Sequence, residues 1–128
     1  MAAREHERGA AVVEFVLVMT LLIPLVLGIA QVALVLHVRN TLAAAASEGA
    51  RAAAPLGATT SDGTNQTRRI IRDSLDDRYA ADVTATWTTI SGVPAAQVEV
   101  RARVPALGLF GPSVSVAVQG HAVREVPP

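Results

Sequence analysis

The longest apolar stretch of the chain runs from Phe15 to Leu36, and its 22 residues, FVLVMTLLIPLVLGIAQVALVL, include no formal charge. A helix of that length extends roughly 33 Å, which matches the hydrocarbon core of a bilayer. A cleaved secretory signal is the alternative, but its apolar region usually covers only about 7–15 residues. We therefore expect a retained membrane helix.

The helical pattern continues beyond this stretch. Residues 37–54, HVRNTLAAAASEGARAAA, are rich in strong helix formers, and Pro55 and Gly57 follow as a stop signal. Small or apolar residues recur on two neighbouring faces, with Leu42, Ala46, Ala50 and Ala54 on one and Ala45, Gly49 and Ala53 on the other. Because small residues allow another backbone to approach closely, we expect one rod, whose first half lies in lipid and whose second half is a packed stem.

The remaining pattern changes from helical to alternating. Residues 56–67 have the composition of a loop, and in the following segment Ile71, Leu75 and Tyr79 recur every four residues, which predicts a short amphipathic helix. Apolar and polar residues then alternate over 82–90, 97–104 and 113–123, which predicts three strands. Short connections favour an antiparallel meander.

The predicted fold class is therefore α+β: a long N-terminal transmembrane and stem helix, a short amphipathic helix and a three-stranded antiparallel sheet. A sheet with one apolar face needs a cover, and the two helices are available to provide it. The expected core of the ectodomain consists of Ile71, Leu75, Val83, Trp87, Val98, Val100, Val114 and Val116.

Composition and charge exclude several classes of function. The formal net charge is zero, so no nucleic acid or other polyanionic partner is expected. The chain has no Cys, and its histidines, His6, His37 and His121, lie in three separate regions without zinc-ligand spacing. Asp73, Asp76 and Asp77 are read as the solvated face of a helix rather than a calcium loop. Without a phosphate loop or a catalytic triad spacing, we expect no enzyme activity, no catalytic residue, no metal and no cofactor.

A carboxylate, Glu14, stands immediately before the apolar stretch, after the charged leader MAAREHERG. An ionisable group at the edge of a hydrocarbon layer usually has a partner or a function, although one this close to the edge also reaches interfacial water. Both interpretations remain open from Glu14 alone. The leader, residues 1–9, has too little apolar material to fold by itself.

The order of features from residue 8 to 15, RGAAVVEF, resembles the prepilin processing site of type IV pilins and pseudopilins. The pair Glu14–Phe15 and the short leader resemble the tight-adherence (Tad, or Flp) branch. The whole plan, one N-terminal span followed by a small α+β ectodomain, resembles a TadE-like minor pilin, and TadF-like proteins share much of this plan. One departure is Ala10, where many type IV pilins have an aromatic residue or Met.

The resemblance implies how the chain is processed and divided. A prepilin peptidase would cut between Gly9 and Ala10, leaving a leader (1–9), a transmembrane and stem helix (10–54) and a small extracytoplasmic domain (55–128). Glu14 would pair with a free N-terminal amine, and Glu14 and Phe15 would serve assembly. The number of basic residues on each side of the membrane helix does not indicate its orientation, since Arg4 and Arg8 precede the helix and Arg39 and Arg51 follow it. The resemblance implies a leader in the cytoplasm and a C-terminal domain outside the cytoplasmic membrane, in a pilus or the cell envelope.

The implied partners are the prepilin peptidase, other pilin or pseudopilin subunits, the Tad assembly platform and membrane lipid. Pro24, followed by Gly28, is expected to kink the membrane helix, although both residues are ordinary in membrane helices. Gln31 is a candidate for an interhelical hydrogen bond. Three hypotheses remain: a minor pilin or pseudopilin of a Tad-type pilus or secretion apparatus, an unprocessed single-pass binding module, and a soluble domain released by cleavage near Ala54.

Overall fold

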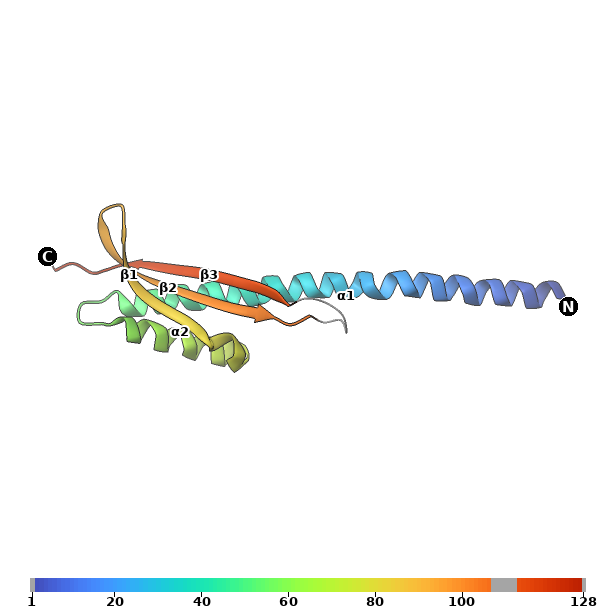
Figure 1. Cartoon of the computed structure of the whole chain (residues 1–128), viewed down its shortest axis with the longest axis horizontal. Coiled ribbons are helices and arrows are strands. Elements are labelled where there is room, and N and C mark those ends of the chain that lie inside the picture. The colour runs from blue at the N-terminus through green and yellow to red at the C-terminus, as the bar shows by residue number, and fades with distance from the viewer. Residues whose placement is uncertain (1, 107–112, 128) are drawn as a thin grey trace.

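The computed structural model describes residues 2–106 and 113–127. Its first helix, α1, spans Ala2–Ala53 and forms a rod whose N-terminal half projects away from the rest of the molecule (Figure 1). The helix also includes most of the leader, which was expected not to fold by itself, because an existing helix is extended at one hydrogen bond per added residue. The remaining elements all lie beside the C-terminal half of α1.

Three antiparallel strands follow in a meander, as predicted. Strand β1 (Asp82–Ile90) pairs with β2 (Val93–Val104), and β2 pairs with β3 (Val114–Val123), so β2 is central. The register places Val83 opposite Val100 and Val100 opposite Val118. Ser91 and Gly92 form the turn between β1 and β2, with φ of 50° and 80°, as a two-residue hairpin turn requires.

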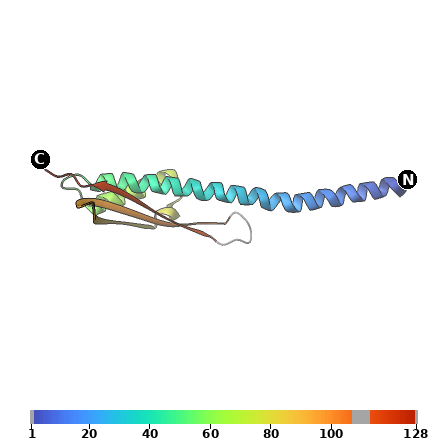
Figure 2. The ribbon, with the colours of Figure 1, turned by 90° about the horizontal axis from the view of Figure 1, so that it is seen from above.

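One face of the sheet is covered by the stem part of α1 and by the second helix, α2 (Thr60–Ser74) (Figures 1 and 2). The two faces predicted from small residues in the stem are buried, and Leu42, Ala45, Ala46, Ala50 and Ala53 have no exposed surface. From the other elements, the core contains Ile71, Tyr79, Ala80, Val83, Val98, Val100, Val104, Val116 and Val118. The stem therefore belongs to the folded unit and is not only a connection to it.

Helix α2 begins seven residues earlier than the amphipathic pattern indicated, within the segment predicted as a loop. Thr59 and Asp62 form a capping box that satisfies the first free backbone N–H groups. Gly63 lies against the stem, where an added Cβ would be 3.0 Å from the carbonyl oxygen of Gly49. The polar composition of residues 60–66 did not indicate a helix, because this part of α2 contacts α1 through Gly63, which has no side chain.

The amphipathic pattern also predicts helix beyond Ser74, where α2 ends. A short 3₁₀ helix, η1 (Asp77–Ala80), replaces the predicted continuation and buries Tyr79. Leu75, expected in the core, is partly buried at its edge. Strand β2 begins four residues before the predicted start, at Val93, and Ser113 precedes β3.

Two predicted core residues are exposed. Trp87 has 41% of its surface exposed and Val114 has 37%, although both follow the apolar alternation of their strands. The guanidinium of Arg124 lies 4.7 Å from the centre of the Trp87 ring and supplies a cation–π contact in place of core packing. The helices do not cover these ends of the sheet, so alternation alone does not bury them.

Candidate functional site

The N-terminal half of α1 presents apolar side chains on every face. From Val12 to Val32, large hydrophobic side chains are exposed all round the helix, with Leu21 at 74% and Phe15 at 62%. Within the described residues, α1 is the helix whose length and composition would allow it to cross a membrane, and its most apolar window is not buried by the rest of the chain. Such a surface needs lipid or other apolar helices around it.

Gly9 and Ala10 lie within the exposed helix, at the point where charged residues give way to apolar ones. A Cβ added at Gly9 would meet no atom within 4 Å. The absence of a side chain at Gly9 therefore has no structural reason in the fold of this chain.

Glu14 lies one helical turn beyond Ala10 and is exposed. Its carboxylate makes no hydrogen bond or ion pair with any residue in 2–106 or 113–127. The fold thus leaves Glu14 and Phe15 on the projecting helix, available to groups from outside the chain.

Pro24 and Gly28 lie inside α1, and the helix continues through both. The helix curves in its N-terminal half (Figure 2), and Pro24 cannot supply the N–H that the carbonyl of Thr20 would otherwise accept. The same region has a shallow apolar groove of about 540 Å³, whose lining includes Pro24, Gly28 and Val32. The expected kink is accommodated as curvature without a break.

Gln31 bonds within the chain. Its side-chain Nε2 donates to the backbone carbonyl of Pro105, at 3.2 Å, and so joins α1 to the end of β2. The sequence pattern did not indicate this contact, because the two residues are 74 positions apart.

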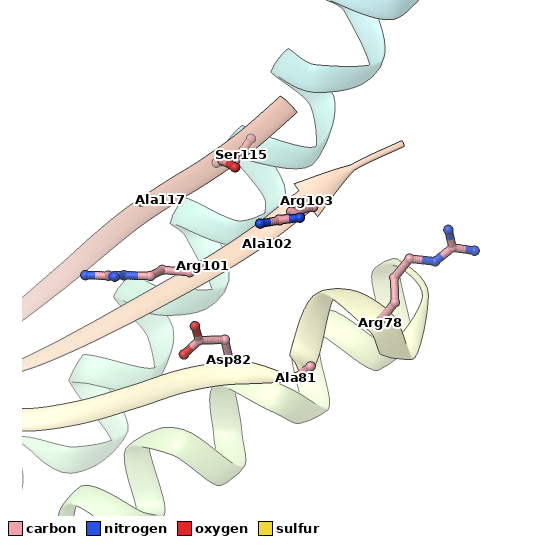
Figure 3. A pocket seen from close by; sticks show the side chains of 9 residues that line it. Arg78, Ala81, Asp82, Arg101, Ala102, Arg103, Ser115 and Ala117 are labelled. Atoms are coloured by element: carbon pink, nitrogen blue, oxygen red, sulfur yellow. The ribbon is translucent and has the colours of Figure 1, made fainter. Parts of the chain in front are cut away.

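A second hollow, of about 700 Å³, lies on the face of the sheet that the helices leave open (Figure 3). Arg101 donates to the Glu99 carboxylate and lies near Asp82, which raises the pKa of the Arg101 guanidinium. The same hydrogen bond lowers the pKa of Glu99. Hydrogen bonds from the backbone and side chain of Arg78 likewise lower the pKa of the Asp76 carboxyl, which caps η1. Arg103 also lines this hollow.

Arg78 and Asp76, and Arg101 and Glu99, form surface ion pairs. The described residues contain no group of three or more His, Cys, Asp or Glu side chains that could hold a metal ion. The feature that distinguishes this molecule is therefore the exposed apolar helix, with a glycine at its polar boundary and a carboxylate one turn further on.

Comparison with curated proteins and with solved structures gave no significant match. A family model described as TadE-like protein matches residues 9–51, a segment that starts at Gly9 and ends two residues before the end of α1. The match covers the exposed apolar helix and most of the packed stem, and it includes residues 9–15 of the RGAAVVEF motif. Over this long N-terminal helix, the chain is therefore similar to TadE-like proteins.

Proposed function

We propose that the protein is a minor pilin or pseudopilin of a Tad-type pilus or secretion apparatus, processed after Gly9 and assembled through its N-terminal helix. The observation that carries the proposal is the coincidence of two boundaries. The family match begins at Gly9, and the exposed apolar surface of α1 begins three residues later, at Val12.

In this proposal, a membrane-embedded prepilin peptidase cuts between Gly9 and Ala10. Gly9 suits such a cut because a residue without Cβ gives an enzyme close access to the backbone, and the fold itself places no demand on Gly9. Cleavage creates an amine on Ala10. In a low dielectric, that cation and the Glu14 carboxylate of the same or a neighbouring subunit offset each other's desolvation.

The proposed role is structural and requires no catalytic group or cofactor. The partners are the peptidase, other pilin or pseudopilin subunits, the assembly platform and membrane lipid. We place the protein in the cytoplasmic membrane, with the domain that contains the sheet outside and the leader inside. An unprocessed single-pass binding module is the second candidate, favoured by the open polar face of the sheet with its 700 Å³ hollow.

The core argues against a soluble domain released near Ala54. Cleavage there would remove Val38, Leu42, Ala45, Ala46 and Ala50, all of which are buried against the sheet or α2. The remaining residues would expose the apolar face of the sheet, so the stem has to stay attached for the domain to fold.

The mature N-terminus tests the proposal directly. Mass spectrometry of the chain from cells that make the Tad machinery should find Ala10 as the first residue. Gly9→Leu should leave the full precursor, because the added side chain obstructs the peptidase but meets no atom of this chain. Gly28→Leu is the matched control, since Gly28 also has open space around it in the same helix, and it should be cleaved normally. Normal cleavage of Gly9→Leu, or a native N-terminus at Met1, would contradict the proposal.

A further inference from the structure

One end of the sheet lies beside the last part of the apolar stretch of α1. Pro105, which follows β2 directly, accepts the hydrogen bond from Gln31. Leu34 and Val35 are partly buried against the core, and Val35 lines a hollow together with the first residues of β3. The folded domain therefore begins at the level of Gln31, five residues before the apolar stretch ends.

This overlap is incompatible with hydrocarbon around the whole of Phe15–Leu36. Val104 and Val114 form the last pair between β2 and β3, and residues 105, 106 and 113 have backbone groups outside the ladder. Arg103 is only one position further into the sheet, opposite Ser115. Backbone groups outside regular structure and arginine side chains are both strongly disfavoured in the hydrocarbon layer.

We propose that the hydrocarbon layer surrounds Ala10–Ala30 and that the adjoining end of the sheet lies in the lipid headgroup layer, where Arg39 and Arg103 bind lipid phosphates. The inference rests on the proposed function in one respect, that α1 spans a membrane. Residues 10–30 form a helix of roughly 31 Å, which is as good a match to the bilayer as the later segment. The span then starts at Ala10, directly after the proposed cleavage site.

The charges at this end of the domain support a phosphate partner. Arg51, Arg72, Arg78 and Arg101 each form an ion pair with a neighbouring carboxylate. Arg39 and Arg103 are exposed, and among the described residues neither has a carboxylate partner. Arg39 lines one hollow together with Val114–Ala117. Arg103 lines the hollow on the open face of the sheet, which shares Ser115–Ala117 with the first (Figure 3).

The two guanidinium groups thus flank the start of β3, at the end of the sheet that is joined to Gln31. A planar guanidinium donates two parallel hydrogen bonds to a phosphate, and its aliphatic stem tolerates contact with apolar surface. Phospholipid headgroups therefore fit both the position and the chemistry of Arg39 and Arg103.

The shift of the span also changes the surroundings of Glu14. With hydrocarbon beginning at Ala10, Glu14 lies about 6 Å inside the layer rather than at its edge. An ionised carboxylate at that depth depends more strongly on a partner.

The level of the membrane can be measured by single-cysteine labelling, because the chain has no Cys of its own. The full-length protein in phospholipid vesicles is treated with a membrane-impermeant maleimide after substitution of Leu21, Leu36 or Thr89, all exposed in the structure. Thr89 lies near the β1–β2 turn, at the other end of the sheet on the same side of the membrane, and serves as the reference within each vesicle preparation.

Leu36→Cys should react within about threefold of the rate of Thr89→Cys, and Leu21→Cys, near the middle of the proposed span, at least about tenfold more slowly, because hydrocarbon shields a thiol from a water-soluble reagent. Protection of Leu36→Cys equal to that of Leu21→Cys would overturn the proposed level while leaving a membrane-spanning helix intact. Rapid labelling of Leu21→Cys would instead contradict the membrane span and with it the proposed function.

The headgroup contact has a separate test. A spin label on Ser115→Cys should be relaxed by a nickel-chelating headgroup lipid at least about fivefold more than the same label on Thr89→Cys, because headgroup contacts are confined to the membrane surface. In vesicles that contain phosphatidylglycerol, Arg39→Gln combined with Arg103→Gln should reduce this relaxation, whereas Arg69→Gln, an exposed arginine on α2, should not. Equal relaxation at Ser115 and Thr89, or no effect of the double substitution, would overturn the phosphate contact.

Discussion

Gly120 of β3 lies directly against Ala46 of α1. A Cβ added to Gly120 would be 2.4 Å from the backbone carbonyl carbon of Ala46 and 2.5 Å from its carbonyl oxygen. Gly120 also pairs with Val98 in the central strand, so it cannot move away without disturbing the sheet. The contact explains why β3 carries glycine at this position: strand and helix pack backbone to backbone.

We therefore expect Gly120→Ala to destabilise the domain by about 1–3 kcal/mol, the usual cost of forcing an extra methyl group into a packed site. The measurement is denaturant unfolding of the full chain in detergent micelles, followed by the fluorescence of Trp87, the single tryptophan. Ser115→Ala, at an exposed position of the same strand, is the control and should change the free energy of unfolding by less than about 0.5 kcal/mol. An unchanged midpoint for Gly120→Ala would mean that β3 and α1 are less closely packed than described.

The two ends of the apolar face of β3 should differ in their sensitivity to substitution. Val116 is 6% exposed, whereas Val114, two residues earlier on the same face, is 37% exposed. Val116→Ala should cost about 1–2 kcal/mol, because it removes packed methyl groups, and Val114→Ala should cost less than half as much. The same unfolding measurement checks the pair, and equal losses would contradict the described end of the core.

The contrast between these valines also explains how far the fold could be predicted from the sequence. Alternation gave the correct strands and inward faces, because β1, β2 and β3 each bury one side. Alternation carries no information on where the covering helices stop, so Trp87 and Val114 were wrongly assigned to the core. The start of α2 could not be predicted for a related reason, since Gly63, which packs on Gly49, has no apolar side chain of its own to indicate burial.

The candidate site depends on local sequence and was therefore more predictable. Gly9, Glu14 and the apolar stretch all lie on one uninterrupted helix, so their relative positions follow from helical geometry alone. The bond between Gln31 and Pro105 could not be predicted in this way, because it depends on the position of β2 against α1.

Glu99 and Arg101 give the domain a defined response to acid. The hydrogen bond from Arg101 holds the pKa of Glu99 below its ordinary value. A carboxyl with a lowered folded-state pKa contributes stability above its unfolded-state pKa, and this contribution is lost as the pH falls through the folded-state pKa. NMR titration should therefore give a Glu99 midpoint below the ordinary glutamate value, and Arg101→Gln should raise that midpoint. Because the pair lies on the surface, the accompanying change in stability should be small, and a midpoint unaffected by Arg101→Gln would contradict the pairing.

Glu14 is the residue whose role depends most on groups from outside the chain. If it pairs with the Ala10 amine of a neighbouring subunit, Glu14→Gln should leave membrane insertion and cleavage after Gly9 intact while reducing incorporation into the pilus or secretion complex. Insertion itself should not suffer, because a neutral amide costs less to place in lipid than a carboxylate. Mass spectrometry of the N-terminus reports cleavage, and the amount of protein in the sheared pilus or complex fraction reports assembly.

Val13→Leu is the control for a general disturbance of this turn of α1, because it keeps an apolar side chain at an exposed position next to Glu14. It should assemble better than Glu14→Gln. Crosslinking from residue 10 to a neighbouring subunit should fall in Glu14→Gln alone, since only that variant removes the charge that an N-terminal amine requires. Assembly of Glu14→Gln at the wild-type level would reduce Glu14 to a carboxylate that reaches interfacial water. Failure of its cleavage would instead assign Glu14 to recognition by the peptidase, and the pairing with an amine would lose its support.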